Sequence, residues 1–153
     1  TFAVFFSAIL LGRWWGGISQ IMYVGIGIAG VPWFANWTGG IAALAGPTGG
    51  YIVGFVIAAF FLGHFVDKYV KSRRLFNMLA LMLFANFVLV YGPGLLQLNL
   101  WLSLIKGQSL GFMELFSIGA APFVVGDIFK IVLSAMIAGG ITPKERFNKE
   151  ADV

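Results

Sequence analysis

Apolar runs separated by short polar segments organise this chain. A helix crosses a bilayer when about 20 apolar residues, rising 1.5 Å each, cover the hydrocarbon core. Five runs predict membrane-embedded helices, over residues 2–12, 18–31, 51–66, 75–91 and 122–139. The first reaches only about half of the hydrocarbon thickness, which indicates either a short helix or a start that lacks what precedes it. The pattern predicts an all-α membrane protein, a multi-span helical bundle.

The segments between these runs depart from the apolar pattern. Residues 33–50 hold five glycines and a proline, which predicts an ordered loop that caps a site, with an ordinary surface loop as the alternative. Gly92-Pro93-Gly94 is predicted to end the helix before it. Residues 95–105 are then too short to span comfortably, which indicates an interfacial or re-entrant piece, and a short amphipathic helix is expected over 110–119.

Composition supports a membrane protein. The chain is 59% hydrophobic and only 10% charged, with a mean hydropathy of +0.92, whereas soluble domains carry about 25% charged residues. It contains no cysteine, so disulfides and thiolate chemistry are excluded.

The formal charge of +4 reflects topology rather than a surface for nucleic acid. Eight of the ten basic residues lie in short segments between or after the apolar runs: Arg13, Lys68, Lys71, Arg73, Arg74, Lys144, Arg146 and Lys149. Basic loops favour the cytoplasmic side. Alternation of the predicted spans then places the C-terminal tail inside, and the 33–50 loop and residues 92–121 outside.

Asp127 and Lys130 are the candidate functional residues, because they interrupt the last apolar run. An ionisable group at that depth costs on the order of 2.5–3.5 kcal/mol, so it rarely faces lipid. Their spacing of three places both on one helix face, where they can pair. The pair predicts a functional site about one to two turns below the outer face, and a structural ion pair is the alternative.

Four motifs, taken together and in order, resemble the BioY family, the biotin-specific S components of energy-coupling factor (ECF) transporters. They are TFAVFFSAILLG at 1–12, GIAGVPWFA at 27–35, GPTGGYIVGF at 46–55 and PFVVGDIFK at 122–130. The resemblance reaches to about residue 139. It implies a fold of six transmembrane helices, of which this sequence begins at the second. Residues 1–141 are then an S-component domain lacking its first helix, and residues 142–153 a solvated cytoplasmic tail.

The resemblance also implies a function. The chain is expected to capture biotin with high affinity and take it up across the prokaryotic plasma membrane, as a multi-pass, substrate-binding subunit of an ECF-type ABC transporter. Its expected partners are biotin, the lipid bilayer, a coupling protein (T component) and two ATPases. Neither a cofactor nor a nucleic acid is expected. The sequence has no GxxxxGK[ST] motif, so ATP hydrolysis is assigned to the partners and the chain is not expected to be an enzyme.

The same resemblance implies the ligand-binding residues. Asp127 and Lys130 form the family's GD-x-x-K motif, and Tyr51 closes GPTGGY. Lys130 is expected to meet the biotin carboxylate, and Asp127 to accept ureido N–H groups while holding Lys130. Aromatic walls are expected from Tyr51, Trp33, Trp37 and Phe123. Asn36 and Asn86 both remain candidates for the ureido ring, and Thr48 and Gly49 complete the expected set.

Two other classes of function use the same charged pair. An intramembrane enzyme would use Asp127 as acid or base, but no second carboxylate lies in a predicted span, and His64 is predicted on the opposite side of the membrane. An ion- or proton-coupled carrier would use Asp127 and Lys130 as a relay. Binding of biotin without nucleotide or gradient discriminates the S component from both.

Overall fold

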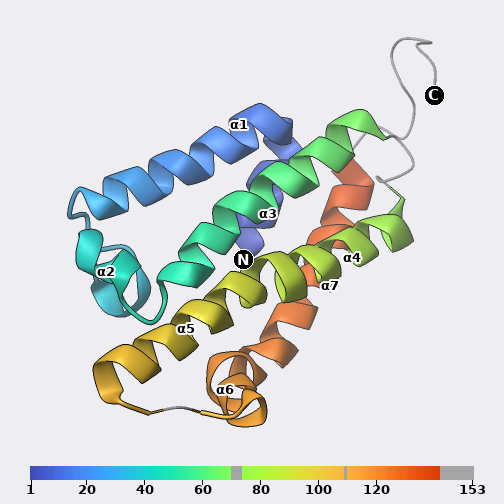
Figure 1. The fold of residues 1–153 in the computed structure, drawn as a ribbon. Helices are drawn as coiled ribbons and strands as arrows, with labels where there is room; N and C mark the ends of the chain where they lie inside the picture. Colours follow the sequence, from blue (N-terminus) through green and yellow to red (C-terminus); the bar gives the residue numbers. More distant parts are fainter. Residues whose placement is uncertain (70–73, 109, 142–153) are drawn as a thin grey trace.

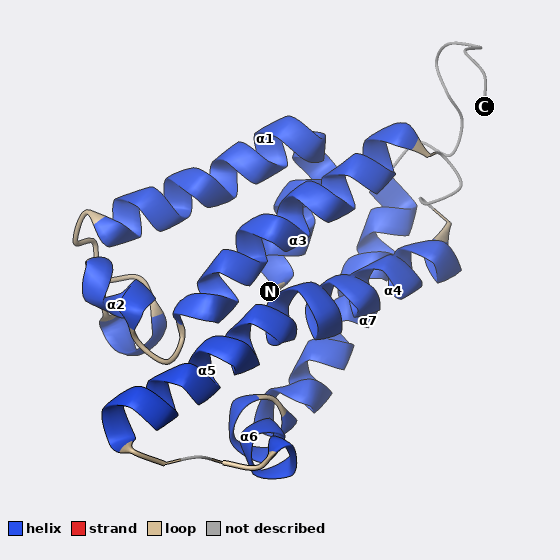
Figure 2. Cartoon of the chain, viewed as in Figure 1, coloured by secondary structure: helices blue, strands red, loops and turns tan. Residues whose placement is uncertain are grey.

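The computed structural model describes residues 1–69, 74–108 and 110–141, and these are helical apart from their connections (Figures 1 and 2). The elements are α1 (Phe2–Ile28), η1 (Ala35–Trp37), α2 (Ile41–Ala45), α3 (Gly49–Lys68), α4 (Leu75–Phe84), η3 (Ala85–Val90), α5 (Tyr91–Lys106), α6 (Phe112–Gly119) and α7 (Ala121–Ile141). By length and composition, four stretches among the described residues could cross a membrane: Phe2–Ile28, which includes a turn at Gly12, Gly49–Lys68, Leu75–Lys106 and Ala121–Gly140. The predicted all-α, multi-span fold is confirmed.

Helix α1 folds back on itself at Gly12. The backbone there has φ 72° and ψ −172°, in the left-handed region that favours glycine. The side-chain amide of Gln20 in the second arm donates to Ser7 Oγ in the first arm at 2.9 Å, so the arms pack together. Residues 13–17 separate the two apolar runs 2–12 and 18–31 in the sequence, but the structure is helical there, because Gly12 alone completes the turn and the second arm resumes at Arg13.

Asp67, near the end of α3, holds this turn in place. Its carboxylate accepts the backbone N–H of Arg13 at 2.7 Å, which satisfies one of the free donors at the start of the second arm and complements the helix dipole. Arg13 also contacts His64 Nδ1 through its guanidinium at 3.4 Å. The basic segment around Lys68 therefore shares one end of the bundle with Arg13, as its charge pattern predicts; residues 70–73 lie outside the described residues.

The sequence around Gly92-Pro93-Gly94 does not end a helix, and that prediction was wrong. Helix α5 runs through it, and with α4 and η3 it forms the 32-residue stretch Leu75–Lys106, so residues 95–105 are not a separate interfacial piece. Element η3 is a π-helical stretch that ends at Val90, three residues before Pro93. Such local π adjustments accommodate a proline ring inside membrane helices.

Helix α3 lies at the centre of the bundle, against α1, η3 and α5. Close packing on the π-helical stretch requires Gly54, where an added Cβ would lie 2.7 Å from both the Leu89 carbonyl oxygen and the Val90 Cα. Small residues permit such backbone approach in lipid. The fully buried side chains of this core include Phe5, Leu62, Met78, Met82 and Ile131.

The connections gather at two ends of the bundle (Figure 1). The α1 turn, the end of α3, the start of α4 and the end of α7 point toward one end, while η1, α2, the end of α5 and α6 lie toward the other. Helix α6 agrees with the short helix expected over 110–119. The predicted tail, residues 142–153, lies outside the described residues.

Candidate ligand-binding site

A cavity of about 390 Å³ lies near the end of the bundle that carries η1, α2 and α6. Ligand pockets in proteins occupy about 300–1,000 Å³ and are mostly apolar, with a few placed polar groups. The apolar and aromatic side chains of this wall include Tyr23, Phe34, Ile52, Phe55, Tyr91, Leu98, Ile118 and Phe123. Asp127 and Lys130, from α7, supply its charged side chains.

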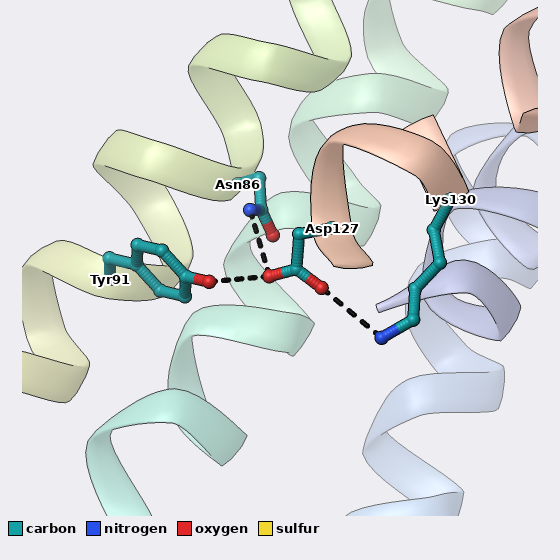
Figure 3. Close-up of polar contacts among 4 residues, drawn as sticks. All are labelled: Asn86, Tyr91, Asp127 and Lys130. Carbon is teal, nitrogen blue, oxygen red and sulfur yellow. Dashed lines mark hydrogen bonds and ion pairs between the residues drawn. The ribbon is translucent and has the colours of Figure 1, made fainter. Parts of the chain in front are cut away.

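Asp127 accepts hydrogen bonds at both carboxylate oxygens (Figure 3). Oδ2 receives the amide of Asn86 at 3.2 Å and the hydroxyl of Tyr91 at 2.5 Å. Oδ1 receives the ammonium of Lys130 at 3.3 Å. The carboxylate is therefore compensated by one cation and two neutral donors, which is what a charge at this depth needs.

The two charges differ in exposure. The side chain of Asp127 is 4% exposed, whereas that of Lys130 is 46% exposed. Among the described residues that line the cavity, Lys130 contributes the only basic side chain. An ammonium held beside a buried carboxylate at a cavity wall can still donate to a second anion, because it carries three N–H donors.

Two tyrosines, Tyr51 and Tyr91, line the cavity together with Asp127. Tyr51, from the first turn of α3, donates its hydroxyl to the Gly119 carbonyl oxygen at 2.9 Å. Its ring packs edge-on against Tyr91, with centroids 6.1 Å apart. Tyr51 thereby connects α3 to the junction of α6 and α7, which closes one side of the cavity.

The 33–50 segment lines part of the cavity through Phe34, Ala35, Pro47 and Thr48. Trp33 stacks on Tyr23 with centroids 5.2 Å apart, and each residue donates to the other's carbonyl oxygen at 3.2 Å. The segment therefore contributes to the cavity wall, as expected of a loop that caps a site; that this cavity is the ligand site stays a prediction.

Gln97 of α5 holds the other end of this segment. Its amide donates to the Leu44 carbonyl oxygen and, at 2.8 Å, to that of Gly46. Gly49 leaves room for this contact, because a Cβ there would lie 2.5 Å from Gln97 Nε2.

The structure brings most of the predicted site residues together. Tyr51, Thr48, Asp127 and Lys130 line the cavity, as does Phe123, and Asn86 is fully buried against Asp127. The others are not in the cavity wall: Trp33 stacks on Tyr23, Asn36 is exposed, Trp37 is 85% exposed, and Gly49 is buried against the loop and Gln97.

Sequence reasoning missed Tyr91, Phe34 and Gln97. A tyrosine directly before Gly-Pro-Gly was read as the end of a helix. Phe34 lay in a segment that was interpreted through its glycines, and Gln97 in a piece that was expected at the interface. The sequence signal for Tyr91 was its position five residues after Asn86. This spacing places the two side chains on one helix face only if the turn between them is π-helical.

These features define a class: a multi-pass helical membrane protein with a largely apolar ligand cavity, one buried carboxylate and its partner lysine near one end of the bundle. The BioY family model matches residues 1–146. This chain belongs to the BioY family.

Individual relatives agree with this assignment. The probable biotin transporter BioY of Methanothermobacter thermautotrophicus is 50% identical over 147 residues, which cover 96% of this chain and 94% of that protein. The biotin transporter BioY of Thermotoga maritima is 36% identical over 137 residues, covering 90% of this chain and 75% of that protein. The relatives are thus named as transporters.

A solved structure has the same fold. The crystal structure of the S-component for biotin from an ECF-type ABC transporter matches with a TM-score of 0.76. The match covers 90% of this chain and 70% of that chain, at 24% sequence identity.

Proposed function

We propose that this chain binds biotin and takes it up across the cell membrane, as the substrate-binding S component of an ECF-type transporter. The observation that carries the proposal is the pairing of Asp127 with Lys130 at the wall of an otherwise apolar cavity, in a chain of the BioY family. Biotin has an apolar ring and tail, a carboxylate and a ureido group, and each has a counterpart in this cavity.

In the proposed complex, Lys130 donates to the biotin carboxylate through a charge-assisted hydrogen bond. The aromatic rings of Tyr51, Phe34 and Phe123 pack against the thiophane ring and the tail. Ureido N–H groups have acceptors in Asp127 Oδ1 and the Thr48 hydroxyl, because a carboxylate oxygen accepts more than one hydrogen bond. No bond of biotin is made or broken.

Energy for uptake is proposed to come from partners. A T component and two ATPases would drive the cycle, with the basic end of the bundle and the C-terminus in the cytoplasm. The cavity would then open toward the outer face, where biotin arrives.

Calorimetric titration of the purified protein in detergent tests the proposal. Biotin should bind without nucleotide or gradient, and Lys130→Ala should weaken binding tenfold or more, roughly 1.5–3 kcal/mol, because one charge-assisted contact is lost. Biotin amide should bind worse than biotin to the wild type.

Lys106→Ala is the matched control, because Lys106 stacks on Trp101 outside the cavity; its affinity should equal that of the wild type. Absence of biotin binding to the wild type would refute the proposed function. Wild-type affinity in Lys130→Ala, or equal affinity for biotin and its amide, would remove Lys130 from the carboxylate.

A further inference from the structure

We propose that Tyr91 is a positioning residue for the ligand, acting together with Asn86 through Asp127 on Lys130. The inference rests on the proposed function for its ligand, and on the π-helical stretch η3 for its geometry. Neither residue is needed to touch biotin. Their role is to fix a buried carboxylate so that the lysine beside it keeps one orientation at the cavity wall.

The π-helical stretch explains how both donors reach one carboxylate. Asn86 lies within η3 and Tyr91 directly follows it. In an α-helix with 3.6 residues per turn, side chains five residues apart diverge by about 140°. A π turn closes its hydrogen bonds after five residues instead of four, so these two side chains share a face. Figure 3 shows both pointing at Asp127 from one helical stretch.

Because the two donors bind the same carboxylate oxygen, the two oxygens of Asp127 have different partners. Oδ2 accepts from Tyr91 and Asn86, which leaves Oδ1 for Lys130. Tyr91 and Asn86 are themselves buried, at 5% and 0% exposure, so water does not readily replace either donor. With Oδ2 fixed, rotation of the carboxylate about its Cβ–Cγ bond is opposed, and Oδ1 stays directed at the ammonium.

Lys130 needs such an anchor because its side chain is long and 46% exposed. An unrestrained lysine loses rotamer entropy when a ligand immobilises it, which lowers affinity. A fixed counter-ion at 3.3 Å removes part of that loss before the ligand arrives. The Tyr91 hydroxyl, which donates to Asp127, therefore contributes to affinity through Lys130, and only while Lys130 is present.

A double-mutant cycle between Tyr91→Phe and Lys130→Met tests this dependence. Tyr91→Phe removes only the hydroxyl, and Lys130→Met removes the ammonium while keeping an unbranched side chain. We expect Tyr91→Phe to weaken biotin binding about tenfold in the wild type and less than twofold in Lys130→Met. A residue that touches biotin directly would lose the same factor in both backgrounds.

Two further tyrosines serve as comparison. Tyr51→Phe removes another hydroxyl of the cavity wall, one that donates to Gly119 and not to Asp127, so any effect on affinity should be the same in both backgrounds. Tyr69→Phe, at the exposed end of α3, should bind biotin as the wild type does.

Thermal unfolding of the ligand-free variants gives a second readout that needs no biotin. Tyr91→Phe and Lys130→Met should be non-additive there as well, because both act on Asp127. If the wild-type protein fails to bind biotin, the proposed function is refuted. The double-mutant cycle measured by thermal unfolding then tests by itself whether Tyr91 positions Lys130 through Asp127. Unchanged affinity in Tyr91→Phe, or additive effects in either cycle, would overturn the inference.

Discussion

At the scale of single residues, Asp127 shows how a membrane helix carries a charge. Its carboxylate receives two neutral hydrogen bonds and one from a cation. These partners satisfy a carboxylate whose side chain is only 4% exposed. Their contacts also make Asp127 the link between the cavity-lining Lys130 of its own helix and the helical stretch that carries Asn86 and Tyr91.

Asp127→Asn tests the importance of this link. The substitution keeps the shape but removes the charge that holds Lys130, and it turns one acceptor position into an N–H₂ donor. We expect biotin binding to weaken tenfold or more and the unfolding temperature of the ligand-free protein to fall. Calorimetric titration and thermal unfolding in detergent measure the two effects.

Glu114→Gln is the control, since Glu114 is an exposed carboxylate on α6 outside the cavity. An Asp127→Asn protein with unchanged affinity and stability would show that the ion pair is dispensable.

The charged pair was predictable from the sequence because its spacing of three within an apolar run is a local signal. Tyr91 was not, because its partner is 36 residues away. A π-helical turn also shifts the helical phase, so an α-helical reading places Tyr91 and Asn86 on different faces. Asn36, by contrast, directly follows the cavity-lining residues Phe34 and Ala35 in the sequence. Its backbone takes a left-handed turn conformation at φ 58°, and the residue is exposed.

At the scale of elements, local turn signals were reliable at one position and misleading at another. The glycine at position 12, between an apolar run and Arg13-Trp14-Trp15, marks a true reversal. The Gly-Pro-Gly segment resembles a stronger break, yet the helix continues, because η3 accommodates the proline and glycines of α3 pack against η3 and Pro93. Packing between helices decided the second case, and packing is not visible in a local pattern.

The 33–50 segment is tied to the bundle by two elements, α1 and α5. Tyr23 and Trp33 form the first attachment, and the side-chain amide of Gln97 forms the second through two carbonyl oxygens. A segment that lines a cavity and is attached by few side chains is expected to limit ligand exchange.

Gln97→Ala removes the α5 attachment without altering the cavity wall, of which Gln97 is not part. We expect biotin to dissociate several-fold faster, because the segment opens more often, while contacts in the closed state are retained. Stopped-flow exchange of bound biotin for an excess of competitor measures the dissociation rate.

Asn99→Ala on the same helix is the matched control, since Asn99 is also half-buried and outside the cavity wall. Equal dissociation rates in Gln97→Ala and the wild type would show that this attachment does not control ligand exchange.

At the scale of the whole molecule, the two ends of the bundle differ in chemistry. One end carries Arg13, Asp67 and Lys68, and the other carries the cavity and the segments that cover it. The basic end is expected in the cytoplasm, and the cavity end then faces the source of the ligand. The sequence predicted that the basic residues and the candidate site lie at opposite ends, because charge distribution follows topology regardless of helix packing; which end is cytoplasmic stays a prediction.

Labelling of single cysteines tests the orientation directly, because these 153 residues contain no cysteine. Gln108→Cys lies in the exposed connection between α5 and α6, and Lys68→Cys at the exposed end of α3. A membrane-impermeant maleimide added to right-side-out vesicles should label Gln108→Cys at once and Lys68→Cys only after the membrane is permeabilised. The reverse order would place the cavity on the cytoplasmic side, where it could not receive biotin from outside, and labelling of both before permeabilisation would contradict a fixed orientation.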